Sequence, residues 1–249
     1  MIKLLLLGLL FLTTLSSNEP PSIIDEMIMT HDSYGSEVNE TITIEPLPKV
    51  LYLNFKTVPT RVIKGEIFSI TLKTLSTVSD FKDITYKITN TQGLEILNSI
   101  PYRVHDSKFF FDTFYFLATS SSAIIPDFTA TLHDDFNTLY KETTLTGSKL
   151  KVVTLNPKDN YANIIANSFD LVKYKTSSYD DKYNIIVFVA QAYNSNIKAL
   201  KLKNVYKQGI ESMTESQFDS KITYYAVIDK KIENFSFTYF NLKKTDLYF

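Results

Sequence analysis

The chain has 249 residues, of which 14% are aromatic and none is cysteine or tryptophan. It is too apolar to be disordered, and the missing cysteines exclude disulfides, thiol catalysis, cysteine-bound zinc and haem attachment. The formal net charge is −1, from 26 basic and 27 acidic side chains. Lysine and arginine do not cluster as they do in nucleic-acid-binding proteins, so no nucleic-acid partner is expected.

The first residues have the pattern of a secretory leader. Lys3 precedes an apolar run from Leu4 to Leu12, and small residues such as Ser16 and Ser17 follow it. The run is too short to span a bilayer, which takes about 20 residues. A buried N-terminal strand or helix is the alternative. We interpret residues 1–17 as a signal peptide and expect a periplasmic or otherwise exported protein, without a transmembrane helix after cleavage, associated with membranes through its partners.

Residues 18–48 are predicted to be an acidic linker. Between residues 19 and 48 there are seven acidic side chains and no lysine or arginine, and prolines bound the stretch. The short alternating run at Thr41–Ile44 is the one place in the linker where a strand could pair with a sheet edge. The rest of the chain is mildly basic, so an acidic segment lying against it is the alternative.

Residues 49–155 are predicted to form an immunoglobulin-like β-sandwich. Apolar residues alternate with polar ones in successive short runs, such as the one from Leu51 to Phe55. Turn residues, such as those at Lys64–Glu66, follow about every 8–12 residues, which is typical of such sandwiches. The run Phe109–Leu117 is aromatic on both faces and therefore indicates a central strand.

A second, smaller β-sandwich domain is predicted at residues 160–249, after a boundary at Asn156–Asn160. Ile185–Ala190 is apolar enough for a buried strand, and apolar residues alternate near residues 222–226 and 235–239. Short helical turns are allowed at Ala162–Ala166 and Ile197–Leu202. The fold class predicted for the whole chain is therefore all-β.

No catalytic, cofactor-binding or metal-binding residue is predicted. The histidines, His31, His105 and His133, lack partners at metal-ligand spacing. The cluster His133–Asp135 could bind a divalent cation, but it fits a turn between strands better. The nucleophile motif Gly-x-Ser-x-Gly and a phosphate-binding glycine loop are both missing from the sequence. A hydrolase assembled from scattered residues is the least favoured interpretation.

Three segments resemble the BatD family, exported proteins of the bacterial aerotolerance operon. Arg61–Leu72 is similar to the strand, Gly-Glu turn and strand that open the family's immunoglobulin-like domains. Phe114–Phe116 with Ile125–Phe128 is similar to its aromatic strand and following "IP" strand, although Ser120–Ser122 stands where the family often has a glycine turn. Phe235–Asn241 is similar to a late aromatic strand of the family.

The resemblance implies a periplasmic, non-catalytic protein without cofactors, linked to stress or oxygen tolerance. Its implied partners are von Willebrand A-type membrane proteins and a MoxR-type ATPase system. Family members usually continue to a C-terminal membrane helix, which the sequence up to Phe249 lacks, so a divergent or truncated member is expected. The leading hypothesis is thus an envelope protein-interaction module. The alternative is a carbohydrate- or surface-binding β-sandwich protein, for which Tyr224 and Tyr225 are the candidate exposed cluster.

Overall fold

The computed structural model describes residues 50–78, 81–133, 139–157, 159–216 and 218–244. About two thirds of this part of the chain is β-strand, and its helical segments are two short 3₁₀ turns, which confirms the predicted all-β fold class. The predicted signal peptide and the acidic linker lie outside the described residues. Among the residues that are described, no helix has the length and apolarity needed to cross a membrane.

The largest sheet of the N-terminal half is antiparallel and has β7 near its centre. β7 pairs with β3 along one side and with β5 and β6 along the other, and β1 pairs with the outer side of β3. The prediction of a central aromatic strand is thereby confirmed. The strands are β1 (Leu51–Thr57), β3 (Ile67–Ser76), β5 (Leu94–Ile96), β6 (Tyr102–Asp106) and β7 (Phe109–Ala118).

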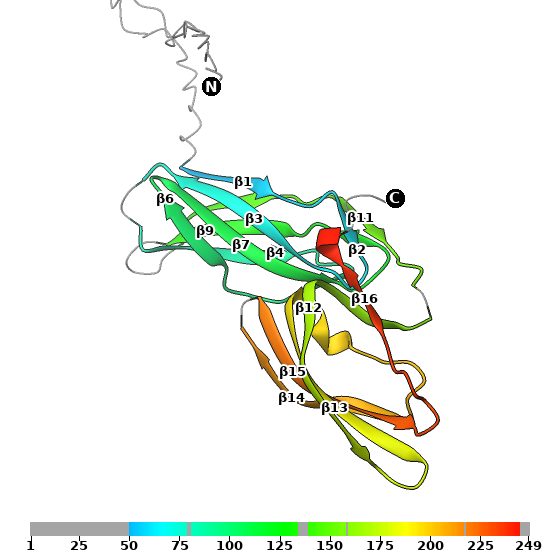
Figure 1. Ribbon diagram of the computed structural model, residues 1–249. Coiled ribbons are helices and arrows are strands. Elements are labelled where there is room, and N and C mark those ends of the chain that lie inside the picture. The colour runs from blue at the N-terminus through cyan, green and yellow to red at the C-terminus, as the bar shows by residue number, and fades with distance from the viewer. Residues whose placement is uncertain (1–49, 79–80, 134–138, 158, 217, 245–249) are drawn as a thin grey trace, which may run out of the picture. The chain divides into compact units, whose positions relative to one another are not determined.

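Two smaller sheets complete this half (Figure 1). One is antiparallel, in the order β10-β9-β4, and the other is mixed, in the order β2-β11-β8. Gly65 lies in the tight turn before β3 with φ of 92°, a conformation that favours glycine, as the predicted turn requires. The strands are β2 (Arg61–Ile63), β4 (Asp83–Thr89), β8 (Ala123–Ile124), β9 (Asp127–His133), β10 (Leu139–Leu145) and β11 (Lys149–Val153).

The core of this half, the first core, lies between the β7 sheet and the β9 sheet. Every second residue of β3, β7 and β9 is buried, as expected for strands with one face toward a core. Phe128 of β9 contacts Phe114 and Phe116 of β7 with ring centroids 5.5 and 6.3 Å apart. The aromatic side chains thus fill the space between two facing sheets.

The strands after residue 160 form one five-stranded sheet, in the order β14-β15-β13-β12-β16 (Figure 1). All neighbours are antiparallel except β16, which runs parallel to the start of β12. The helical turn allowed at Ala162–Ala166 is wrong, because this segment opens β12 and pairs with β16. The strands are β12 (Tyr161–Ser178), β13 (Tyr183–Ser195), β14 (Lys207–Glu215), β15 (Asp219–Asp229) and β16 (Thr238–Asn241).

Irregular segments, rather than a second sheet, cover the inner face of this sheet and form the second core with it. The 3₁₀ turn η1 (Ile197–Ala199), which lies within the predicted Ile197–Leu202 turn, leads to the buried Leu200 and Leu202. Phe235 and Phe237 pack on the same core, although the strand β16 begins only after them. A last 3₁₀ turn, η2, spans Leu242–Lys244.

The two cores do not share residues, and the strands of the two halves do not pair with each other in the described chain. The strands of the first half end at Val153, and those of the second begin at Tyr161. Residues 47–249 nevertheless group as one compact unit by their contacts. The division into two β-sandwich domains, at residues 49–155 and 160–249, stays a prediction.

Candidate functional site

A buried network of charged and polar side chains in the first half is one candidate for a functional site. Asp112 on β7 is fully buried and accepts hydrogen bonds from Tyr86 Oη at 2.5 Å and from Arg103 Nε at 2.7 Å. Arg103 on β6 also donates to Asp83 Oδ1 and to the backbone oxygen of Ile84, both at 2.7 Å. Arg103 therefore links the edge of the β7 sheet to the edge of the β9 sheet.

The electrostatics of this network indicate a structural role. Burial, and then the neighbouring Asp112 carboxylate, raise the pKa of Tyr86, so its hydroxyl stays protonated and donates. Burial acts to lower the pKa of Arg103, but its bonds to Asp112 and Asp83 outweigh burial and raise that pKa. Thr74 Oγ1 lies 2.7 Å from Tyr86 Oη. Each charged group thus has its partners, and no group is left available for chemistry on a substrate.

Glu66 is a second titratable group with a shifted pKa. Burial raises the pKa of its carboxyl, and the hydrogen bond from Ile63 N–H at 2.7 Å opposes that rise. The same residue's N–H donates to Ile63 O at 2.9 Å, so the side chain closes the turn between β2 and β3. Across the described residues no group of three or more metal-ligating side chains comes together.

The histidine cluster considered in the sequence is only partly described. His133 ends β9, and its Nε2 lies 2.8 Å from Thr85 Oγ1 on β4, while Asp134 and Asp135 lie outside the described residues. His105 on β6 stacks on Phe110 with ring centroids 4.6 Å apart. His31 is also outside the described residues. The two described histidines thus have structural contacts within the first half.

A cleft of about 1090 Å³ lies where strands of both halves come together. Its walls come from the β7 sheet, the Lys64–Gly65 turn, the start of β12, the end of β13 with η1, and the β14–β15 turn. We call it the junction cleft. Binding sites for small molecules commonly form between such units.

Aromatic side chains line one wall of the junction cleft. The ring of Phe218 lies 5.2 Å from that of Tyr115 and 6.5 Å from that of Tyr102, centroid to centroid. Tyr102 also contacts Tyr115 edge-on at 5.7 Å, yet 41% of it is exposed. The wall thus offers an accessible aromatic surface held by residues from both halves.

Ser195, at the end of β13, is a polar residue that lines the junction cleft without a partner. It is 7% exposed, and its Oγ has no hydrogen-bond partner among the described residues. A buried hydroxyl without a partner is destabilising, by about 1–3 kcal/mol. The neighbouring Asn196, in contrast, is held by Ile165 N–H at 2.7 Å and by Asn163 O at 3.2 Å.

A second accessible surface is the outer edge of the β12–β13 hairpin. The pairing of β12 with β16 covers only Tyr161–Ala166, whereas β13 pairs with β12 as far as Ser178. All nine residues Asp170–Ser178 are exposed, among them Leu171, Val172 and Tyr174, of which Tyr174 is 73% exposed. We call residues 170–178 the hairpin edge. Its outward backbone groups are available to another strand.

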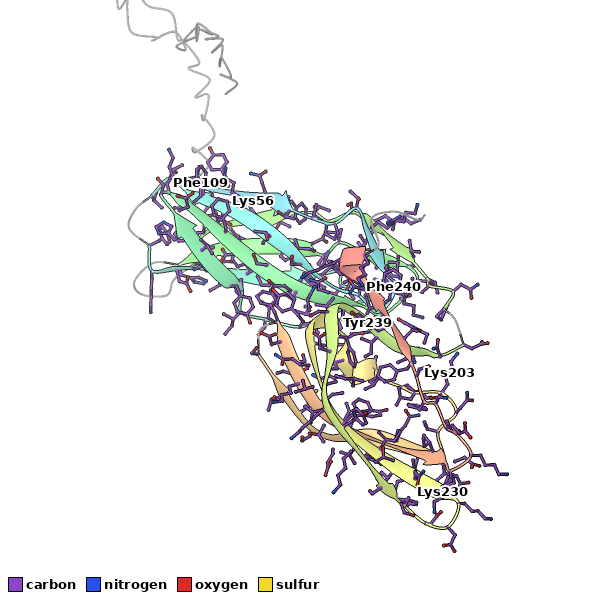
Figure 2. The ribbon with its side chains drawn as sticks, in the orientation of Figure 1. Lys56, Phe109, Lys203, Lys230, Tyr239 and Phe240 are labelled. Atoms are coloured by element: carbon purple, nitrogen blue, oxygen red, sulfur yellow. The ribbon has the colours of Figure 1, made fainter. Side chains whose placement is uncertain are left out.

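The hairpin edge also carries two features that restrict pairing. A β-bulge lies between Leu171 and Lys173, and Lys173 and Lys175 place two positive charges along the strand. Both features discourage an identical edge from adding to this one. Lys230 lies beside the hairpin turn (Figure 2), where its N–H donates to Lys182 O at 2.9 Å. The edge therefore favours a negatively charged partner over a second copy.

The tyrosine pair proposed from the sequence is not an exposed cluster, because Tyr224 is buried and Tyr225 is half-buried. Tyr224 is 2% exposed, and its hydroxyl lies 3.1 Å from Leu200 O and 2.9 Å from Gln208 Oε1. The accessible aromatic cluster is instead Tyr102 with Tyr115 and Phe218, which sequence reasoning missed. These residues come from distant strands, and no local pattern indicates that they meet. The exposed edge of β12 was missed as well, because Asp170–Ser178 is polar and weakly alternating.

Comparison with known proteins gives no family assignment. No protein-family model matches the chain. No curated protein matches its sequence.

Proposed function

We propose that the protein is a non-catalytic interaction module of the cell envelope, which binds an extended segment of another protein at the hairpin edge. The observation that carries this proposal is the run of nine exposed residues on a strand whose outer edge is unpaired in the described chain. An added strand would satisfy the backbone groups of that edge. The resemblance to the BatD family supports the same reading and suggests its von Willebrand A-type and MoxR-type systems as partners.

The register of the hairpin predicts the pattern of the bound segment. Tyr174 lies opposite Phe188 and Thr176 lies opposite Ile186, so these side chains share the core-side face of the sheet. Lys173 and Lys175 lie on the other face. A bound strand would therefore alternate apolar side chains, beside Tyr174, with acidic side chains, beside the lysines. A second copy of this edge carries one acidic side chain, Asp170, against two lysines, and so matches this pattern poorly.

Site-specific photocrosslinking in native envelopes tests the proposal. A photoreactive residue replacing Tyr174 should crosslink to a distinct protein, through an extended acidic and apolar segment identified by mass spectrometry. The same residue replacing Ile100, which is 82% exposed in the first half, is the matched control and should not give that product. Recovery of monomer alone, or crosslinks only to a second copy, would contradict the proposal.

Charge reversal distinguishes specific binding at the hairpin edge from nonspecific electrostatic binding. Lys173→Glu with Lys175→Glu should weaken the partner's binding at least about tenfold, since like charges then face each other. Lys87→Glu with Lys203→Glu changes the net charge by the same amount at exposed positions away from this edge, and should leave binding unchanged. Equal losses in the two double variants would show that net charge, and not the hairpin edge, governs binding.

A further inference from the structure

We infer that the junction cleft is a second binding site, for a neutral oligosaccharide. This inference does not depend on the hairpin edge, because the two surfaces share no residue. It rests on three independent properties of the cleft: the balance of its charges, its aromatic wall and the unpartnered hydroxyl of Ser195.

The charges that line the cleft cancel. Lys64 and Lys198 are balanced by Glu95 and Glu215, and Lys198 Nζ lies 2.8 Å from Glu215 Oε2. No histidine is among the described residues that line it. Phosphate and carboxylate ligands are usually held by clustered cations, and a cation by clustered carboxylates, so this lining favours a ligand without net charge.

The aromatic wall suits a ligand with apolar faces. Tyr102, Tyr115 and Phe218 hold one another by edge and stacked contacts between 5.2 and 6.5 Å, so the wall is fixed before a ligand arrives. A sugar ring presents C–H groups on its faces and hydroxyls around its rim. The ring faces can pack on the exposed part of Tyr102 while the rim stays available for hydrogen bonds.

Neutral polar groups occupy the rest of the lining. Thr119, Thr154, Ser216 and the Asn163 side chain are exposed in the cleft and can donate or accept hydrogen bonds. Ser195 adds a hydroxyl whose hydrogen-bonding capacity is unused by the described residues. A ligand hydroxyl bonded to this Oγ would remove the cost of leaving it unpartnered.

The volume of the cleft sets the size of the ligand. At about 1090 Å³ it lies just above the range of roughly 300–1,000 Å³ for small-molecule sites, and so has room for a short oligosaccharide. An extended peptide is the competing occupant. An extended peptide would bind more favourably at the hairpin edge, where unpaired backbone groups and two lysines are available.

Calorimetric titration of the full chain with cellotriose, chitotriose and maltotriose tests the inference. At least one of these trisaccharides should bind, and Tyr102→Ala should weaken that binding at least about tenfold through loss of the aromatic surface. Ser195→Ala should weaken it several-fold, because it removes one hydrogen bond. Tyr206→Ala removes an exposed tyrosine that lies outside both the cleft and the hairpin edge, and it is the matched control, expected to bind as the parent does.

Folding is checked on every variant by its thermal midpoint. If Tyr102→Ala unfolds, Leu97→Ala takes its place, since Leu97 is an exposed residue of the same lining. The inference is overturned if none of the three trisaccharides binds at millimolar concentration, or if Tyr206→Ala abolishes binding while the cleft variants retain it. If no envelope protein crosslinks at the hairpin edge while a trisaccharide still binds, only the hairpin-edge proposal is contradicted.

Discussion

The two halves of the molecule are both β-structures, but they build their cores differently. The first core lies between two facing sheets and has four phenylalanines and three alanines among its 17 buried members. The second core lies between one sheet and irregular segments, and has five alanines among 13. Facing sheets stand about 10 Å apart and need large side chains to fill the gap.

A loop can approach a sheet more closely. The covering segment of the second core binds β12 through its own backbone, with Lys201 N–H donating to Ala162 O at 3.1 Å. Small side chains at the sheet surface permit this approach. The two cores thus have similar shares of aromatic side chains, but the alanines of the second core let a covering segment bind the sheet through its backbone.

The buried polar groups that join elements also differ between the two halves, since they are charged in the first half and neutral in the second. In the first half Arg103 bonds to Asp112, which lies opposite it in the β7 sheet, and joins this sheet to the β9 sheet through Asp83 and Ile84 O. In the second half a neutral side chain, Gln208 of β14, joins the sheet to its covering segment, because it binds both backbone groups of Leu202, at 2.7 and 2.9 Å, and accepts from Tyr224. Removing one partner should therefore cost more in the first half than in the second.

The largest effect is expected for Asp112→Ala. The substitution leaves Arg103 and Tyr86 without their buried acceptor, so the free energy of unfolding should fall by about 3–5 kcal/mol. Urea titration measures it. Asp83→Ala removes the exposed partner of the same arginine and should cost only about 0–1 kcal/mol. Equal losses of unfolding free energy in the two variants would show that burial does not make Asp112 contribute more to stability than Asp83.

A smaller loss is expected for Ala190→Leu in the second core. Ala190 is fully buried, and a larger side chain there must displace its neighbours, which costs about 1–3 kcal/mol. Thr176→Leu on the exposed hairpin edge adds a comparable side chain in the same sheet and should change stability little. A tolerated leucine at position 190 would show that the second core is loosely packed.

Tyr224→Phe should lower the free energy of unfolding by about 0.5–1.5 kcal/mol, because the neutral hydrogen bonding of its hydroxyl to Leu200 O and Gln208 is lost.

Burial raises the pKa of Tyr224, and of Tyr161, to about 12. Their folded-state pKa values exceed the ordinary value of 10, so their contribution to stability is intact below pH 10 and is lost as pH rises toward 12. In Tyr224→Phe the free energy of unfolding should therefore fall less steeply with rising pH than in the parent protein, which urea titrations between pH 9 and 12 would measure.

The smallest effect is expected for Ser195→Ala. Because Oγ has no partner among the described residues, the substitution should leave the unfolding free energy unchanged or raise it slightly. Ser220→Ala, at another buried serine of the same cleft, is the comparison. A clear loss of stability in Ser195→Ala would mean that the hydroxyl has a structural partner, and would weaken its assignment to a ligand.

The sequence by itself was enough to predict the all-β class, the central strand at Phe109–Leu117 and the Gly65 turn. These features follow from local patterns, since side chains alternate along a strand and glycine adopts positive φ readily. It failed at Ala162–Ala166, where short apolar runs suit helix and strand alike and pairing with β16 decides the outcome. β6 was also missed, because all five of its residues are exposed and give no alternation.

Only the tertiary structure decided which polar and aromatic residues meet. Asp112 sits in an alternating apolar run. The pairing of β6 with β7 places Arg103 opposite it in the same sheet, whereas the hydrogen bond from Tyr86 depends on how two sheets face each other. The wall of Tyr102, Tyr115 and Phe218 depends on contacts between distant strands, and the unpaired length of β12 on where β16 ends. Local periodicity fixes which face of a strand is buried, whereas the partners of that face are set by long-range packing that no short stretch of sequence encodes.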